Sequence, residues 1–517
     1  MATTVADLPS RGIRGRIPAG VKRGAAVTVG AALVGLLAGH LVLGGQFVAI
    51  FGLIAVFIPV AMWRKPEISP VVMLSCALLI EQFHGSVEPT NANAPGAANA
   101  ALAPVIPITG KLPFFQGLGS LHLDGSDLLI LLIFAIVAFK VYQARPIPWP
   151  HSLLSRGVKY MMFCLLLGLA IGASHHFNMR EALQEARPYV YLGSAFVLTA
   201  LLIRSRAGLQ WMLWTLVIAE AIKSVQGVII YIGTRSWAVP PEAVLGHEEA
   251  YFFDLFLLLV AGLWMFDVRG RLRTVATWLL PLVIFADLVN NRRAAWLMLG
   301  GGLITLMVIG YVALPNRRRV LGRMAMVLVA MSAVYFPLYW NKDGTLAQPA
   351  RAIKSSISPD PRDAASDLYR IEEDANLEYN IAQGGLIGKG FGIPIDYALP
   401  IANIQAIDPG ILYIPHNGVL YVLMRMGLLG GIAQWCMIGT GILVACRLAK
   451  SGDKQIGLIG ALVACALVAY ALEGATDQGF YFYRIAFVTG GLLGMAEAGR
   501  RMLAARSVTP APTVVEA

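Results

Sequence analysis

Charged residues are scarce in this sequence, since only 14% of its 517 residues are Asp, Glu, Lys or Arg, whereas 57% are hydrophobic. A soluble enzyme of this length carries more charge, so the composition excludes that class. A bilayer core of about 30 Å needs about 20 apolar residues per helix, and such stretches recur along most of the chain. The sequence therefore predicts an all-α, polytopic membrane protein.

Cysteine is also rare, and its five copies lie in or beside apolar stretches, which indicates neither a disulfide framework nor a thiolate metal site. The histidines give no metal-ligand spacing beyond the adjacent pair His175-His176, and His247-Glu248-Glu249 lacks the second His of a helical zinc motif. A Gly-rich phosphate loop, an Asp-x-Asp motif and a nucleophile elbow are missing too. We therefore expect no metal and no cofactor.

The net charge of +11 comes from short basic clusters between apolar stretches, which the positive-inside rule explains without a nucleic-acid partner. About twelve to fourteen spans are expected. The candidates are 25–43, 46–63, 69–83, 126–142, 160–173, 190–203, 211–232, 252–266, 277–288, 294–314, 324–340, 419–446, 456–472 and 479–496.

One topology places seven basic clusters in the cytoplasm, together with both termini. They are Arg64-Lys65, Arg145, Arg204 with Arg206, Arg269 to Arg273, Arg317 to Arg319, Arg447 with Lys450, and Arg500-Arg501. The predicted organisation is a basic N-terminus (1–24), a first set of membrane helices (25–340), a large exoplasmic loop (341–416), C-terminal membrane helices (417–497) and a cytoplasmic tail (498–517).

Within the large loop, 363–383 has apolar residues at helical spacing among charged ones and ends at Gly384-Gly385, which predicts an amphipathic helix over the mouth of the membrane domain. His416 and Asn417 follow where the loop meets the next span. An imidazole there can exchange a proton near neutral pH, and an Asn can orient a hydroxyl or a sugar ring. An interfacial His can equally cap a helix or bond a carbonyl.

Several arginines on the predicted exoplasmic side are not explained by the topology rule: Arg180, Arg187, Arg292, Arg293 and Arg370. Guanidinium forks match phosphate oxygens, so arginines that converge would bind a diphosphate. Alternatively, each pairs with a nearby acid. Arg292 and Arg293 open an apolar helix, where an anion should compensate them.

Acidic residues offer fewer candidates. Glu473 and Asp477, before the last span, could face the same cavity as His416. Glu220 and Lys223 lie three residues apart within one span, and we expect them to form a structural ion pair.

Two patterns together resemble the O-antigen ligase family of polytopic glycosyltransferases. His416-Asn417 is followed after nine residues by Gly427, two residues and Gly430, and Arg293 is followed after three residues by Leu297, as in that family. The segment 386–392 is similar to the family's "PLLGxGxG" element, although Gly384-Gly385 stands where the family usually has Pro.

The resemblance implies a glycan donor on a polyprenyl (undecaprenyl) diphosphate and a sugar hydroxyl as acceptor, at the exoplasmic face of a bacterial inner membrane, without a metal or nucleotide sugar. By resemblance, Arg293 and Arg370 would hold the diphosphate, His416 would take the acceptor proton or position the diphosphate, and Asn417 would support His416. In-line attack would invert the anomeric centre. The acceptor would be another glycan or glycolipid, such as a lipopolysaccharide core.

Two other functions stay open. A polymerase of capsule, exopolysaccharide or O-antigen repeats would share the donor and the arginines and differ in the acceptor. A transporter of lipid-linked glycans would also use arginines in a cavity. It should, however, carry charged residues through the depth of its helix bundle and show internal repeats.

Overall fold

The computed structural model describes residues 57–82, 114–115, 123–143, 150–237, 243–402 and 410–508. The chain divides into two compact units, Met1–Val60 and Ala61–Ala517, and the account below concerns the second. The predicted span 25–43, most of the span 46–63, the basic N-terminus and most of the segment 84–125 lie outside the described residues.

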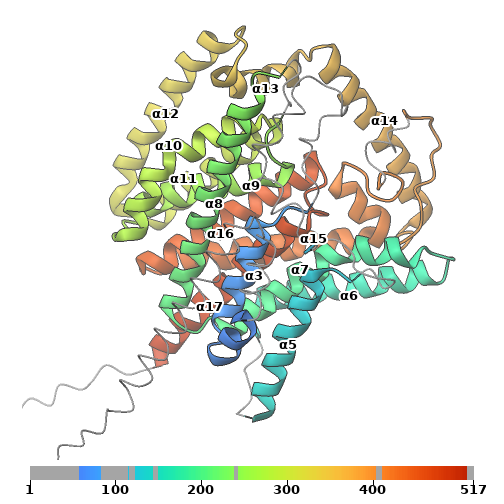
Figure 1. The fold of residues 1–517 in the computed structure, drawn as a ribbon, viewed down its shortest axis with the longest axis horizontal. Coiled ribbons are helices and arrows are strands. Elements are labelled where there is room, and N and C mark those ends of the chain that lie inside the picture. Colours follow the sequence, from blue (N-terminus) through green and yellow to red (C-terminus); the bar gives the residue numbers. More distant parts are fainter. Residues whose placement is uncertain are drawn as a thin grey trace, which may run out of the picture. The chain divides into compact units, whose positions relative to one another are not determined.

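Helices form nearly all the regular structure of the described residues, as the composition predicts (Figure 1). They are α3 (Ile68–Leu79), α5 (Gly125–Gln143), α6 (Leu153–Ala173), α7 (Met179–Leu202), α8 (Arg206–Thr234), α9 (His247–Met265), α10 (Arg271–Asn290), α11 (Arg293–Ala313), α12 (Arg318–Tyr339), α13 (Gln348–Ile357), α14 (Pro361–Gly384), α15 (Gly418–Ala449), α16 (Lys454–Thr476) and α17 (Tyr483–Val508). Among the described residues, 7 helices are long and apolar enough to cross a membrane. The chain is thus an all-helical, multi-pass membrane protein.

Polar residues fix where several helices begin. The side chains of Ser152, Ser205 and Asp453 accept hydrogen bonds from backbone N–H groups in the first turns of α6, α8 and α16. Asn178 and Asn417 do the same for α7 and α15. These caps satisfy N–H groups that have no partner inside the helix.

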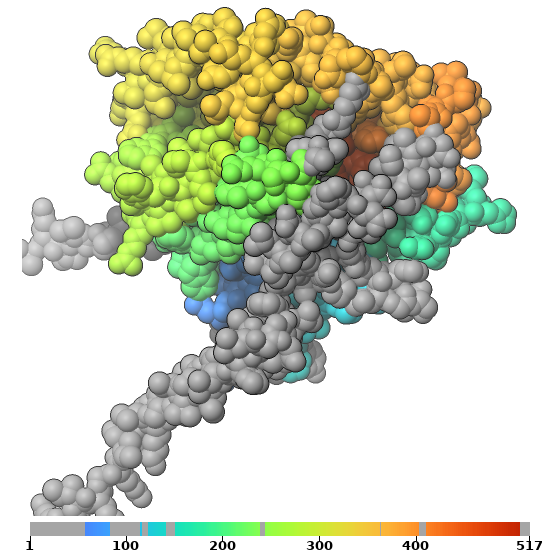
Figure 2. Space-filling view, turned by 45° about the horizontal axis from the view of Figure 1, so that its top comes forward, coloured from blue at the N-terminus to red at the C-terminus, as the bar shows by residue number. Residues whose placement is uncertain are grey.

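The segment predicted as one large loop contains two helices, α13 and α14. The predicted amphipathic helix is α14, and it ends as expected, because Gly385 takes the left-handed conformation (φ +56°) and its N–H bonds the carbonyl of Ile381 at 3.0 Å. α14 packs on α15, at the upper right of Figure 1. Figure 2 shows the yellow and orange residues, which include α12 to α14, gathered over one side of the unit.

α15 is interrupted at Gly427, whose φ of +64° and ψ of −165° are not helical. The glycine-rich segment 386–392 enters this break. The N–H groups of Lys389 and Gly390 donate to the carbonyls of Met424 and Arg425 (2.8 and 3.1 Å), and the N–H of Leu429 donates to the carbonyl of Leu386 (3.1 Å). The two glycine patterns noted in the sequence therefore form one substructure.

Two groups of inter-helix segments lie at opposite ends of the bundle. At one end, Asp267 meets Lys454 (2.8 Å) and Arg317 (3.7 Å), and Asp453 pairs with Arg206 and with Arg506 (3.2 Å). Arg206 and Arg317 come from clusters predicted to be cytoplasmic, whereas Lys454 and Arg506 belong to none of those clusters. The other end contains the segments that carry His247, Arg293, His416 and Asp477.

The ion pair predicted between Glu220 and Lys223 is not formed. Lys223 does not pair with Glu220 but with Glu81 (2.8 Å) and Glu249 (3.2 Å), because its side chain points towards other helices. Glu249 also receives Arg484 at 2.7 Å. Both carboxylate oxygens of Glu220 are buried without a hydrogen-bond partner.

Candidate functional site

Helix α14 organises the candidate site. Its residues Asp363, Asp367, Arg370 and Asp374 are three or four positions apart, so they share one helix face, and Glu373 adjoins them. Each of these five side chains contacts a residue from another part of the chain. The charged face of the amphipathic helix therefore brings the predicted site residues together.

His416 is anchored to this face by Glu373, a nearly fully buried residue. The backbone N–H of His416 donates to Glu373 Oε2 at 2.9 Å, and its Nδ1 lies 3.3 Å from both carboxylate oxygens. Burial acts to lower the pKa of His416, but the hydrogen bond and charge of Glu373, with the charge of Asp477, outweigh it and raise this pKa above its ordinary value. With Nδ1 held by a carboxylate, Nε2 is the nitrogen placed to exchange a proton with another molecule.

Asn417 has a double structural role beside His416. Its Oδ1 caps α15 by accepting from the N–H groups of Val419 and Leu420, and its Nδ2 donates to Asp374 at 3.2 Å. Both contacts fix the turn that carries His416 against α14. The helix cap considered as an alternative role for His416 is thus made by Asn417.

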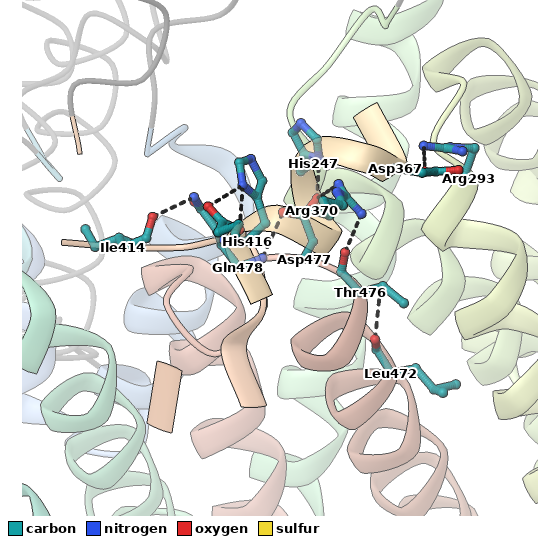
Figure 3. A network of polar contacts seen from close by, with 11 residues as sticks. His247, Arg293, Asp367, Arg370, Ile414, His416, Leu472, Thr476, Asp477 and Gln478 are labelled. Carbon is teal, nitrogen blue, oxygen red and sulfur yellow. Dashed lines mark hydrogen bonds and ion pairs between the residues drawn. The ribbon is translucent and has the colours of Figure 1, made fainter. Parts of the chain in front are cut away.

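Arg370 lies between α14 and the turn after α16 (Figure 3). Its Nη1 donates to the carbonyl of Thr476 at 2.7 Å, and its Nη2 lies 3.9 Å from Asp477 Oδ2. Asp477 also receives Nδ1 of His247 at 3.1 Å. Burial acts to raise the pKa of Asp477, but the charge and hydrogen bond of His247, with the charges of Arg370 and His416, hold it well below its usual range.

Arg293 begins α11 and reaches the same face of α14. Its Nη2 lies 3.4 Å from Asp367 Oδ1, and its Nη1 lies 3.7 Å from Asp363 Oδ2 and 3.4 Å from Ser355 Oγ. A positive charge at a helix N-terminus is unfavourable, and these two aspartates supply the compensating anions. Asp367 and Glu373 are six residues apart, which corresponds to about 9 Å along the helix axis.

The remaining predicted residues are less closely associated with this cluster. Arg292 donates from Nη2 to the carbonyl of Leu245 at 3.3 Å. Arg180 is exposed at the start of α7. Arg187 is buried against the start of α5, where it pairs with Asp127 (3.2 Å) and Asp124 (3.5 Å).

Glu473 is buried in the last turn of α16, one turn before Asp477, and its carbonyl accepts the N–H of Asp477 at 2.8 Å. The structure thus gathers His416, Asn417, Arg370 and Arg293 around α14, with Asp477 beside them. Arg187 instead pairs with Asp124 and Asp127 near the start of α5.

Sequence reasoning missed Glu373, Asp374, Asp367 and His247. The signal for the first three was the group of acidic residues on either side of Arg370 in α14. We interpreted these residues only as the polar face of an amphipathic helix. His247 was considered for a zinc motif alone. Among the described residues, no group of three or more His, Cys, Asp or Glu side chains is placed to hold a metal ion.

A polar hollow lies at the opposite end of the bundle. It is lined by Arg206, Asp267, Val268, Arg269, Gly452, Asp453, Lys454 and Gln455. The charged residues of its lining form ion pairs with one another, and no histidine is among them. We therefore place the candidate site at α14 and not at this hollow.

Comparison of the sequence with protein-family models gives no match, and comparison with curated proteins gives none either. The functional assignment therefore depends on the residues and their geometry.

Proposed function

We propose that this protein is a glycosyltransferase of the O-antigen ligase type. It moves a glycan from a polyprenyl (undecaprenyl) diphosphate to an acceptor hydroxyl at the exoplasmic face of a bacterial inner membrane. One observation carries the proposal: the imidazole of His416 is anchored through Nδ1 to a buried carboxylate of α14, the helix that also carries Arg370 and the partners of Arg293. A base and fixed positive charge are what this transfer requires.

Each residue has a defined task in the proposed reaction. Nε2 of His416 takes the proton of the acceptor hydroxyl as its oxygen attacks the anomeric carbon. The bond between that carbon and the diphosphate oxygen breaks, and the diphosphate leaves with the electron pair. Arg370 and Arg293 stabilise the negative charge that develops, and attack from the opposite side inverts the anomeric centre.

Glu373 keeps the ring of His416 in one orientation and stabilises its protonated form. Asn417 holds the turn that carries the ring. This division resembles other acid–base sites, in which a carboxylate orients the imidazole and does not itself take the proton.

A polymerase of polysaccharide repeats would use the same groups with a growing chain as the second substrate. The ligase-like spacing of His416, Gly427 and Gly430 favours transfer of a finished glycan to another molecule.

Transport of a lipid-linked glycan is a second candidate, because one observation favours it. Asp254 and Asp287 are fully buried in α9 and α10, and none of their carboxylate oxygens has a hydrogen-bond partner. Together with Glu220 and Arg484 they distribute ionisable groups through the bundle, as expected for a transporter.

Incubating the purified protein with a lipid-linked oligosaccharide, with and without an acceptor glycolipid, separates the candidates. One shifted product that requires the acceptor supports a ligase, and a ladder of lengthening products supports a polymerase. His416→Ala should reduce transfer at least about 100-fold, the usual size of an acid–base contribution. His175→Ala, which removes an exposed histidine, is the control. No product in any arm, with glycan movement across proteoliposomes, would favour the transporter.

A further inference from the structure

Asp477 connects His247 with Arg370, which is far from it in the sequence. Its Oδ2 lies 3.1 Å from Nδ1 of His247 and 3.9 Å from Arg370. Its orientation is fixed by its own N–H, which donates to the carbonyl of Glu473 at 2.8 Å, and by Oδ1, which accepts the N–H of Gln478 at 2.8 Å. A rigidly held carboxylate therefore positions the imidazole of His247.

The environment of His247 leaves one edge of its ring accessible. His247 is the first residue of α9, its side chain is 46% exposed, and its ring stacks on Phe482 with centroids 6.3 Å apart. Phe482 covers one face, and Asp477 occupies Nδ1. The edge that carries Nε2 is the part of the ring directed to solvent or to a substrate.

His247 and His416 are arranged in the same way. In both, Nδ1 contacts a poorly exposed carboxylate, which is Asp477 for one and Glu373 for the other. Arg370 lies beside both, because it contacts Asp477 and sits one turn from Glu373 on α14. Figure 3 shows both rings above Asp477, with His416 to the left of Arg370 and His247 over it.

We propose that His247 is a second catalytic residue, which acts as the general acid for the departing diphosphate while His416 acts as the base. This inference rests on the proposed glycosyl transfer. The Nε2 proton of protonated His247 passes to the diphosphate oxygen as its bond to the anomeric carbon breaks. The acceptor proton passes to His416, and exchange with water returns both histidines to their starting forms.

The groups around His247 support a proton donor. Asp477 supplies a negative charge at Nδ1, and Glu248 follows on the same helix, although it is buried and faces Arg484 at 3.9 Å. Arg370 and the N-terminal end of α9 oppose a positive charge on His247. They also attract phosphate, which favours a diphosphate beside His247.

The test measures kcat and KM of transfer for the wild type and three variants. His247→Gln keeps an N–H donor but cannot release its proton, so it should lose about 100-fold in kcat. Asp477→Asn removes the carboxylate that holds Nδ1 of His247 and should lower kcat as well. His175→Gln should leave kcat unchanged.

A kcat of His247→Gln within about twofold of the wild type would overturn the proposal while glycosyl transfer itself stands. If His247→Gln does not fold, a wild-type kcat in Asp477→Asn overturns it. If the wild type transfers no glycan, the proposed function fails, and binding of undecaprenyl diphosphate then decides about His247. Equal affinity of the wild type and His247→Gln for this lipid excludes any contact with the diphosphate.

Discussion

Arg425 of α15 and Glu185 of α7 form a fully buried ion pair, with Nη2 and Oε1 2.5 Å apart. The same arginine donates to the carbonyls of Ile393 (2.5 Å) and Tyr413 (2.7 Å), and Glu185 Oε2 accepts the N–H of Gly392. The pair thus joins two helices of the bundle to both ends of the loop that precedes His416. Its function is to hold the site loops, and neither residue is placed for the reaction itself.

Removing Glu185 should therefore destabilise the protein strongly. Glu185→Ala leaves Arg425 charged and buried without its partner, which costs about 3 to 5 kcal/mol in comparable cases. We expect a clearly lower apparent melting temperature in detergent and loss of transfer. Glu181→Ala, one turn away on α7 and partly exposed, is the control. Equal melting temperatures for the two variants would show that the pair contributes no net stability.

The break in α15 gives a second prediction. Gly427→Ala places a side chain at a φ of +64°, where its Cβ would collide with the backbone of Leu386. A left-handed φ costs a non-glycine residue about 1 kcal/mol or more before any collision is counted. Gly439→Ala, in the same helix with open space around its Cα, should be neutral or slightly stabilising.

Thermal unfolding and transfer should both be measured for these two variants. We expect Gly427→Ala to lose stability and activity together, because the segment 386–392 loses its place in the helix break. Wild-type behaviour of Gly427→Ala would contradict the described pairing.

The pH dependence of transfer should show the effect of the ion pair between His416 and Glu373. As a general base, His416 works when neutral, and Glu373 raises its pKa. The acid limb of the wild-type profile should therefore have its midpoint above the ordinary His value of about 6.5. Glu373→Gln removes the carboxylate charge, so the pKa falls and the midpoint moves to lower pH.

Glu378→Gln is the matched control, since Glu378 is exposed on the same helix. It should keep the wild-type midpoint. An identical acid limb in Glu373→Gln and the wild type would remove His416 from the role of base.

A diphosphate-binding role and a structural role of Arg293 predict opposite effects of Asp367→Asn on donor binding. If Arg293 binds the diphosphate, it must exchange Asp367 for phosphate oxygens. Arg293→Ala should then weaken donor binding about tenfold, whereas Asp367→Asn should strengthen it by removing the competing anion. If the contact only joins α11 to α14, both variants should weaken binding alike. Titration with undecaprenyl diphosphate measures both.

Local patterns were sufficient to predict most helices. Apolar length predicts α11 to within one residue at each end, and helical spacing with a terminal glycine pair predicts α14. The last span was placed too early, because residues 477–482 form a turn whose apolar composition resembles a helix start. The short helix α13 was not predicted.

The partners within the site could not be read from local patterns. Glu373 is adjacent to two other acidic residues, and only the way α14 packs on α15 selects it for His416. The same holds for Lys223, which has an acid three residues away and pairs with two distant ones. Pairing of charges is decided by the packing of elements from different parts of the chain, which a single sequence does not specify.

The entry of the glycine-rich segment into α15 also has a consequence for biosynthesis. Residues 386–392 leave the ribosome before Met424, Arg425 and Leu429, which are their backbone partners, and Asp477 is translated later still. The segment must therefore wait at the membrane surface until the C-terminal helices have inserted. A nascent chain arrested before α15 would already contain Arg293 and Arg370 but could not yet hold them in a working arrangement.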